Sequence, residues 1–488
     1  MRENIAKLIA VMSMLFLSAL LISCAEIEQP SLPDSEIETL SVLNDAPYPY
    51  IISYTEGDGS ALIRLPNEYF TKADFLYDFD YMLRRMNDTF PYFGVVERRY
   101  GLDIKNLARN VRALIEYYPF SMLDFAYEVG LEPEGIPALC RMVFWSILRY
   151  EFFGELPSMG HLDLWWGDCP MFLDELIRIA QEAPKLFAFL TRNDPRFRYY
   201  YNPIEIWLGT QPAIGPVITM EVLEEKQIAY INISTFSPRV DILRHHRDQL
   251  DVFYGEIREF EHLIIDIRDS AGGWSEFAFS LVMEPLWPDS ENLPTMVMYV
   301  FYRDSQIGRE LALRHIKSVS EAPVFAPESD VLSTVSELIE ESYLPNLNET
   351  DLNALGYGFR INVGLDGLRN QNHPLTDIFP MAQRNPFQGQ IWLLTSGINM
   401  SASAFFARLA KDFGFATLVG EPVDGHFSNS GGLRFHGLPN TGITALWDVD
   451  YLTDQYGRAF EEFPTEPHFF NRPGMDALET VLQMIKEM

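Results

Sequence analysis

The sequence predicts an α/β protein in which a small helical domain precedes a larger core of strands and helices. Apolar residues recur at helical spacing over residues 71–118, and further helical stretches are expected at 137–153 and 171–190. In the second half, short apolar runs rich in branched residues alternate with helical segments, which favours an α/β layer with partly parallel strands. These strand candidates are residues 227–234, 263–267, 295–302, 390–395 and 416–419.

Length and charge restrict the classes of function. The chain has 488 residues, 47% of them hydrophobic, which is enough for two or three packed units. Its 37 basic and 69 acidic residues give a net charge of −32, which repels phosphate backbones and anionic lipid surfaces. A nucleic-acid partner is therefore not expected. The acidity itself is typical of a solvated surface and indicates no particular function.

The N-terminus is typical of an export signal. Basic Arg2 and Lys7 precede an apolar run over residues 8–22, which is too short for a stable membrane span. The run ends in Leu-Ile-Ser-Cys24, which is similar to a bacterial lipobox, where the cysteine is acylated and becomes the first mature residue. This resemblance implies export and attachment through lipid on Cys24 to the extracytoplasmic face of the bacterial cell membrane. An uncleaved anchor and a chance cysteine are the alternatives.

Composition divides the chain into five segments. Residues 1–23 are the expected signal peptide, 24–49 a flexible tether poor in large apolar groups, and 50–65 a short hairpin around Gly-Asp-Gly. Residues 66–200 are expected to be mainly helical, and residues 215–488 to form the α/β core. Within the core, residues 346–388 are rich in Asn, Gly and Pro, which predicts a long loop near the site.

Cysteine usage indicates neither a metal site nor a required disulfide. Besides Cys24, only Cys140 and Cys169 are present. They allow one disulfide in an exported protein, but buried free thiols are an equal alternative. Because no metal-ligand spacing occurs, we expect no metal ion in the site.

A serine lies where a predicted strand meets a predicted helix. The apolar strand 390–395 is followed by a short turn, and Ser401-Ala402-Ser403-Ala404 opens an apolar-faced helix. Free N–H groups and the positive helix end can stabilise an oxyanion there, and small neighbours leave room for a substrate carbonyl. The alternative is that Ser401 or Ser403 is only an N-cap, as serines at helix starts usually are.

A glycine pair follows another predicted strand. Asp266-Ile-Arg268-Asp-Ser270-Ala-Gly272-Gly273 comes directly after the strand 263–267. Two glycines let the backbone turn sharply and point an N–H group at a ligand. Taken alone the pair is weak evidence, because glycine pairs after strands are mostly turns.

Four segments in order resemble the signatures of the tail-specific serine peptidases, the C-terminal-processing and tricorn-like enzymes. They are the strand 227–234 with Phe236, the segment 266–273, Ser401-Ala402 and Val419-Gly420-Glu421-Pro422, and Thr89-Phe-Pro-Tyr92 is similar to the helical region of that family. The resemblance implies a ClpP/crotonase-like catalytic core and peptide or protein substrates, with no cofactor. It also implies that Ser401 is the nucleophile, and that the N–H groups of Ala402 and of Gly272 or Gly273 form the oxyanion hole.

A serine hydroxyl needs a base at neutral pH, and the chain departs from one branch of the family here. C-terminal-processing enzymes have a lysine after the Gly-Glu-Pro segment, where this sequence has His426. Met159-Gly160-His161 resembles the tricorn-like segment that supplies a histidine base, although its first two residues differ from the pattern. The resemblance therefore implies His161 as general base, with Glu461 as the group that orients it. His426 is a supporting donor, a substrate contact or an alternative base; His161 could instead be a structural histidine and Glu461 a solvated carboxylate.

Two other classes of function stay open on the sequence. A non-catalytic binding protein on the same fold is the chief rival, because fold alone does not separate the two. The serine, the glycine pair and a candidate histidine favour catalysis. A coenzyme A-dependent acyl-transfer enzyme fits poorly with export and acidity. No stretch over residues 162–226 resembles a PDZ domain, so recognition of substrate C-termini has no support in the sequence.

Overall fold

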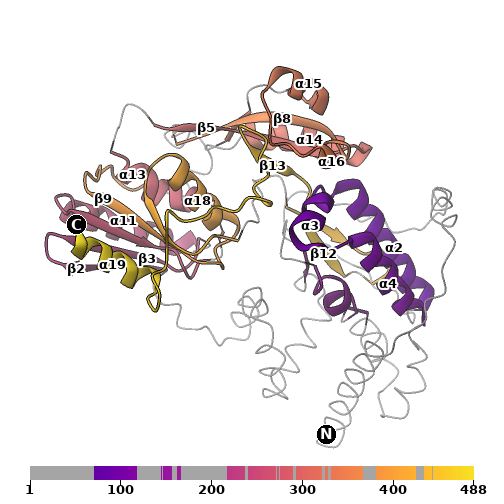
Figure 1. Ribbon diagram of the computed structural model, residues 1–488, viewed down its shortest axis with the longest axis horizontal. Helices are drawn as coiled ribbons and strands as arrows, with labels where there is room; N and C mark the ends of the chain where they lie inside the picture. Colours follow the sequence, from indigo (N-terminus) through magenta and orange to yellow (C-terminus); the bar gives the residue numbers. More distant parts are fainter. Residues whose placement is uncertain are drawn as a thin grey trace, which may run out of the picture.

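The computed structural model arranges the residues that it describes in three β-sheets and the helices that cover them (Figure 1). In the view of Figure 1, the six-stranded sheet lies at the left, the five-stranded sheet at the top, and the N-terminal helices at the right. The structure describes residues 71–117, 144–145, 147–156, 162–165, 217–236, 240–270, 272–273, 275–288, 293–320, 325–327, 331–365, 381–424, 433–441 and 443–488.

The six-stranded sheet is parallel except at one end. Its order is β14-β10-β9-β4-β3-β2, and β2 runs antiparallel to β3. Strands covered on both faces are apolar along their length, as in β4, where Leu263, Ile264 and Ile265 are fully buried. Four strands expected from the sequence are thereby confirmed. The strands are β2 (Ile218–Glu224), β3 (Ile228–Ile233), β4 (His262–Asp266), β9 (Gln390–Thr395), β10 (Thr417–Gly420) and β14 (Phe469–Phe470).

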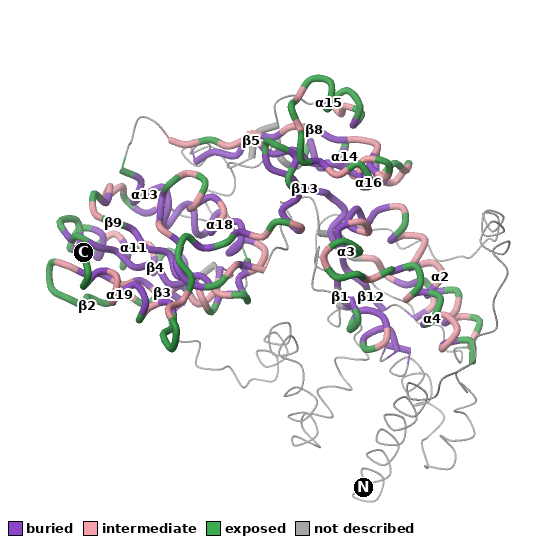
Figure 2. Tube along the Cα trace, in the orientation of Figure 1, coloured by how far each residue is buried: buried purple, intermediate pink, exposed green. Residues whose placement is uncertain are grey.

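Helices cover both faces of this sheet (Figure 2). Alternate residues of β4 point to opposite faces, so Leu263 and Ile265 join the larger hydrophobic core, whereas Ile264 joins a smaller one. The larger core includes α11 and α18, each of which connects two parallel strands, and the smaller core is closed by α19. The helices are α11 (Val240–Glu256), α12 (Ser275–Ala278), η5 (Phe279–Met283), α13 (Glu284–Leu286), α18 (Ser401–Asp412) and α19 (Ala477–Glu487).

The strand register brings three chain segments to one edge of the sheet. Asp266 pairs with Leu394, and Thr395 pairs with Gly420, so β4, β9 and β10 end in neighbouring rows. The segment after β4 contains the glycine pair, and the segment after β9 leads into Ser401. Ligand sites of open parallel sheets lie at this carboxyl edge.

A second, antiparallel sheet corrects one expectation from the sequence. Its order is β13-β5-β8-β6, and β7 also pairs with β8 as the fifth strand. Strand β8 lies within the stretch 346–388 that we expected to be a loop. Phe359, Ile361 and Val363 are buried at alternate positions of β8, but Gly and Asn between them lower the β-propensity of the segment. Pairing with β5, which is itself an expected strand, overrides that propensity. The elements are β5 (Thr295–Arg303), β6 (Phe325–Pro327), β7 (Ser333–Thr334), β8 (Leu355–Gly364), β13 (Tyr451–Asp454), α14 (Gln306–Ser320), α15 (Val335–Glu341) and α16 (Glu349–Leu352).

The N-terminal helices pack with strands from the last part of the chain. β1 pairs with β12 and β12 with β11, so two late strands lie among the early helices. Trp447 of β12 donates its indole N–H to Thr89 Oγ1 at 2.9 Å. The elements are α2 (Lys72–Thr89), α3 (Phe93–Tyr100), α4 (Ile104–Tyr117), η4 (Leu148–Phe152), β1 (Asp163–Trp165), β11 (Leu433–Gly437) and β12 (Thr444–Asp448).

A buried carboxylate connects α2 to the turn between β11 and β12. Asp78 accepts hydrogen bonds from the backbone N–H of Asn440 at 2.9 Å and of Thr441 at 2.8 Å. The Thr441 hydroxyl donates a third at 2.7 Å. Burial raises the pKa of Asp78 from 3.8 to about 6, although these three hydrogen bonds lower it. The turn is therefore held by a carboxyl group whose charged form is disfavoured by its surroundings.

Several expectations fall outside the described residues: the signal 1–23, the tether 24–49, the hairpin 50–65 and the helix 171–190. The boundaries 66–200 and 215–488 stay predictions. In the described part of the chain, no helix combines the length and the apolar character needed to cross a membrane.

Candidate active site

Ser401 lies at the junction between β9 and α18 in an unusual backbone conformation. It is the first residue of α18, and its φ is +52°. A side chain other than glycine in this left-handed region costs about 1–2 kcal/mol. Met400 occupies the N-cap position, so neither Ser401 nor Ser403 is the N-cap that the sequence left as an alternative. A strained serine at a strand-to-helix turn is the arrangement that presents a nucleophilic hydroxyl above a sheet.

Gly272 lies directly against Ser401. A Cβ atom at Gly272 would lie 2.9 Å from Cβ of Ser401 and 2.6 Å from the carbonyl oxygen of Met400. Its φ of +109° is also one that side chains rarely adopt. The glycine is needed here because the two backbones approach more closely than any side chain allows.

The predicted oxyanion groups come together at this contact. The same Cβ position at Gly272 lies 3.1 Å from the backbone N of Ala402. The carbonyl of Gly272 accepts a hydrogen bond from Phe236 N–H at 3.0 Å, which fixes the orientation of the glycine segment. Gly273, the next residue, is exposed. The structure thus places Gly272 next to Ser401 and Ala402, and the oxyanion role of these groups stays a prediction.

Asn399 fastens the turn before Ser401 to the glycine segment. Its buried side-chain amide donates to the carbonyl oxygens of Ile267 at 2.6 Å and of Ser270 at 2.8 Å. Its side-chain oxygen accepts from Ser396 N–H at 2.8 Å. The sequence reasoning missed this residue. Asn in a turn signals side-chain to backbone bonding, but its distant partners are not visible in the sequence.

Two serines add to the same fastening. The Ser396 hydroxyl donates to the carbonyl oxygen of Arg268 at 2.6 Å. The Ser403 hydroxyl lies 2.8 Å from the carbonyl oxygens of both Ser270 and Met400. Together with Asn399, these contacts hold the nucleophile turn and the glycine segment in one fixed geometry, as a preorganised oxyanion site requires.

The Gly-Glu-Pro segment supports the other side of the turn. A side chain at Gly420 would collide with the carbonyl of Thr395, and its φ of +136° is also suited to glycine. Glu421 accepts the N–H of Gly397 on its carboxylate at 3.2 Å. Its backbone carbonyl accepts the Thr395 hydroxyl at 2.8 Å. These two residues therefore support the turn that leads into Ser401.

Asp266 and Arg268 form an ion pair at the end of β4. The guanidinium of Arg268 donates to Asp266 at 2.8 Å, and the Tyr230 hydroxyl donates to the same carboxylate at 2.7 Å. Arg268 also reaches Asp476, the N-cap of α19, at 3.0 Å. Hydrogen bonding to Asp266 raises the pKa of Arg268 above its ordinary value. Asp266 and Arg268 together therefore link the end of β4 to α19.

Glu461 is buried in a segment that runs along α18. Its exposed fraction is 1%. Phe460 stacks on the guanidinium of Arg408 of α18 at 4.8 Å, and Lys411 of α18 donates to the carbonyl of Glu466 at 2.7 Å. Val423 N–H donates to the carbonyl of Thr465 at 3.1 Å, which joins the segment to the strand end after β10. The segment that contains Glu461 therefore lies against the C-terminal half of α18, the helix that begins at Ser401.

Other buried carboxylates lie near Glu461. Burial raises the pKa of Tyr92 well above 10, and Glu461, Asp450 and Asp448 each raise it further by their charge. Tyr92 itself stacks on Tyr451 with ring centroids 5.1 Å apart. Strand β12 ends at Asp448, and its partner β1 begins at Asp163, two residues after His161.

Three predicted site groups cannot be placed. His161, His426 and Cys24 lie outside the described residues, as do Cys140 and Cys169. Among the residues that the structure describes, no group of three or more His, Cys, Asp or Glu side chains could hold a metal ion.

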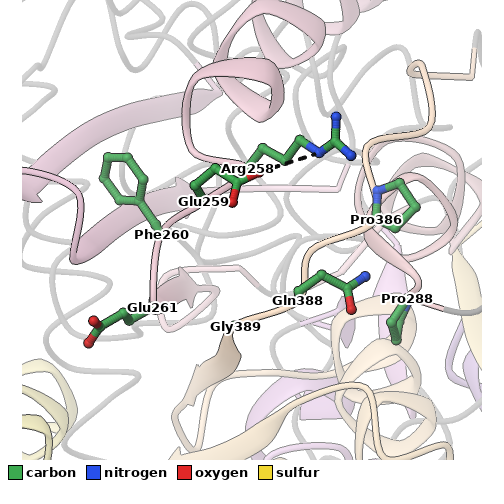
Figure 3. Close-up of a pocket in the computed structure, with 8 residues that line it drawn as sticks. All are labelled: Arg258, Glu259, Phe260, Glu261, Pro288, Pro386, Gln388 and Gly389. Atoms are coloured by element: carbon green, nitrogen blue, oxygen red, sulfur yellow. Dashed lines mark ion pairs between the residues drawn. The ribbon is translucent and has the colours of Figure 1, made fainter.

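A surface depression of about 550 Å³ lies away from this site (Figure 3). Phe260, Glu261 and Gly389 line it, close to where β4 and β9 begin. Figure 3 also shows the exposed ion pair of Arg258 and Glu259, 3.9 Å apart, beside it. Because Ser401 follows the other end of β9, the depression is not part of the candidate active site.

Comparison with known proteins decides the family. Residues 227–469 match the profile of Peptidase family S41. The protein belongs to this family of serine peptidases. In this S41 peptidase, the matched range includes Ser401, Gly272 and Glu461, whereas His161 precedes it.

Solved structures resemble this S41 peptidase only distantly. A structure described as a peptidase from Parabacteroides merdae is 14% identical, with a TM-score of 0.44 and coverage of 84% of this chain and 96% of its own. A lipoprotein from Streptococcus agalactiae is 12% identical, with a TM-score of 0.41 and coverage of 86% and 99%. Mature CPAF is 12% identical, with a TM-score of 0.44 and coverage of 85% and 96%. Likeness at this level does not define the substrate, and no curated protein sequence matches the chain.

Proposed function

We propose that this serine peptidase cleaves peptide bonds through an acyl-enzyme on Ser401, with His161 as general base and Glu461 as the group that orients it. The observation that carries the proposal is the contact between Gly272 and Ser401. The serine is held at a φ of +52° with a glycine backbone pressed against it. Strain of this kind persists where the surrounding structure over-determines it, as at active sites.

The reaction divides into acylation and deacylation. In acylation, Ser401 Oγ attacks the substrate carbonyl carbon while His161 takes the hydroxyl proton. The N–H groups of Ala402 and of Gly272 or Gly273 donate to the oxyanion of the tetrahedral intermediate. The C–N bond then breaks, and His161 returns the proton to the leaving amine. In deacylation, water attacks the ester with the same base, and the acid product leaves Ser401 free.

Glu461 suits the orienting role by its burial and its place. A buried carboxylate near an imidazole stabilises the imidazolium that forms during proton transfer. Asp448 and Asp450 are buried as well, and β1 begins close to His161 in the sequence. These features support a histidine from the segment before β1 as the base. His426 is the competing base in this proposal, because it follows Asp424 by two residues.

Labelling with a fluorophosphonate probe tests these roles on the protein without its first 24 residues. We expect wild type to label, Ser401→Ala not to label, and His161→Ala to lose labelling while His426→Ala keeps it. Ser336→Ala is the matched control, because Ser336 is an exposed serine on α15. Loss of labelling in His426→Ala with retention in His161→Ala would reverse the assignment of the base. A folded wild type that never labels would favour the non-catalytic binding protein.

We also propose that the peptidase is exported and anchored through lipid on Cys24, with peptide or protein substrates outside the cytoplasm. The support is the signal-like run of residues 8–22 followed by Leu-Ile-Ser-Cys24. A single acyl chain binds membranes only marginally, so anchoring requires several. Metabolic labelling with a palmitate analogue, followed by membrane fractionation, tests this. Cys24→Ser is expected to lose both the label and the membrane fraction; a labelled Cys24→Ser variant would refute it.

A further inference from the structure

Helix α3 is hydrogen-bonded to the segment that contains Glu461. The guanidinium of Arg98 makes two hydrogen bonds to the carboxylate of Glu462, both at 2.7 Å. It also donates to Asp351 at the end of α16, at 2.6 Å. Paired, two-pronged contacts of this kind are geometrically specific. Arg98 therefore fastens α3 to two elements from the second half of the chain.

The next residue of α3 reaches Glu461 itself. Arg99 donates a hydrogen bond to the backbone carbonyl of Glu461. Its guanidinium also stacks over the ring of Tyr100 at 5.0 Å. This cation–π contact leaves the guanidinium edge free to donate. The carbonyl contact acts on the backbone of Glu461 and so on the place from which its carboxylate extends.

Arg99 also acts on Asp424, which belongs to the strand end on the other side of the nucleophile turn. The backbone N–H of Asp424 donates to the carbonyl oxygen of Asn399 at 2.8 Å, two residues before Ser401. Burial raises the pKa of Asp424 from 3.8 to about 6, and the charge of Arg99 lowers it. The same charges act on Tyr100. Burial raises the pKa of Tyr100, the charge of Arg99 lowers it, and the charges of Asp424 and Glu461 raise it.

From the hydrogen bond to Glu461 and the charge near Asp424 we propose that Arg99 is a positioning residue that keeps the Glu461 segment next to the Asp424 strand end. The active site would then be complete only with the N-terminal helix α3 in place. The inference rests on the proposed function in one respect, namely that Ser401 is the nucleophile. It assigns to the N-terminal helical part of the chain a role in catalysis that the four family segments in the core do not contain.

The attraction between Arg99 and Asp424 depends on pH. Among the residues that the structure describes, the charge of Arg99 acts on Asp424, and the charges of Asp424 and Glu461 act on Tyr100. Burial favours neutral Asp424, whereas the positive charge of Arg99 favours its carboxylate. This attraction is therefore lost as pH falls through about 6. In a variant without Arg99, protonation of Asp424 removes no such attraction, so the pH dependence that it causes should be weaker.

The test compares Arg99→Gln, Asp424→Asn and the double variant in the rate of fluorophosphonate labelling across pH. We expect Arg99→Gln to label about tenfold more slowly near neutral pH, in line with the loss of one positioning contact. Its rate should fall less steeply than that of wild type as pH decreases through about 6. The double variant should be little slower than either single variant, because the two residues act as one unit. Arg99→Lys should recover part of the rate.

A control variant and a hydrogen-exchange measurement distinguish a positioning role of Arg99 from a folding defect and from failure of the proposed function. Arg109→Gln removes an exposed arginine of α4 and should leave the rate and its pH dependence unchanged. Hydrogen exchange of wild type and Arg99→Gln reads the geometry without catalysis. The Asp424 amide and residues 459–463 should exchange faster in the variant. If wild type does not label but these amides respond, the role of Ser401 is wrong and that of Arg99 stands. Unchanged exchange, or a wild-type rate and pH dependence in Arg99→Gln, would overturn the inference.

Discussion

Gly272→Ala is the substitution for which the structure gives the sharpest expectation. The added methyl group would lie 2.6 Å from the Met400 carbonyl oxygen and 2.9 Å from Ser401 Cβ. Overpacking of this kind costs about 1–3 kcal/mol. The φ of +109° adds strain of about 1–3 kcal/mol for a side chain. Relief of these terms separates the Gly272 segment from Ser401, which disturbs the proposed oxyanion site, and losing one oxyanion donor lowers rates about 10²–10³-fold.

The assay measures the labelling rate with a fluorophosphonate and urea unfolding on the same samples. Gly414→Ala is the matched control, because Gly414 has a φ of +70° but nothing within 4 Å of an added Cβ. The free energy of unfolding of that variant should fall by only about 1–2 kcal/mol, because its backbone is left-handed at this position, and its labelling rate should be that of wild type. If Gly272→Ala labels at the wild-type rate, the close contact between Gly272 and Ser401 does not control the reactivity of the serine.

Two other predictions concern the contacts around Ser401, and a third concerns the buried carboxylate of Asp78. Asn399→Ala removes the donor to the carbonyls of Ile267 and Ser270, so we expect a loss of about 1–3 kcal/mol in urea unfolding and slower labelling; a wild-type labelling rate would contradict this. Ser401→Gly should be more stable than Ser401→Ala by about 1 kcal/mol, because glycine relieves the left-handed φ, and equal urea midpoints would count against strain there. The raised pKa of Asp78 means that its contribution to stability is present below pH 3.8 and is lost as pH rises through about 6. Wild type should therefore lose on the order of 3 kcal/mol relative to Asp78→Asn between about pH 4 and pH 7, and parallel urea-stability profiles for the two proteins would refute this.

The strands of the core could be predicted because each is a local pattern. The continuous apolar run of β4 and the branched residues of β3 indicate buried parallel strands without knowledge of their partners. β8 could not be predicted, since Gly and Asn obscure its alternation and its stability comes from pairing with β5. The late strands β11 and β12 were missed for the same reason, because β11 pairs with β12 and β12 pairs with the distant strand β1.

The candidate site divides in the same way. Ser401 at a strand-to-helix junction, and a glycine pair after a strand, are readable in the sequence because strand, turn and helix are adjacent there. Asn399 and Arg99 were not found by sequence reasoning. Each acts through hydrogen bonds to backbone carbonyls far away in the chain. Because every residue has a backbone carbonyl, the sequence does not show which one is the acceptor. The roles of His161 and His426 stay predictions.

The sequence by itself determined the order of the peptidase segments, the place of Ser401 between a strand and a helix, and the apolar strands of the core, because hydrophobic period and turn residues are local properties. Only the tertiary structure decided that Gly272 presses on Ser401, that Asn399 joins their two segments, and that α3 reaches Glu461. Those contacts depend on the parallel register that ends β4, β9 and β10 at one edge. Register is set by the packing of the whole sheet, so no single segment encodes it.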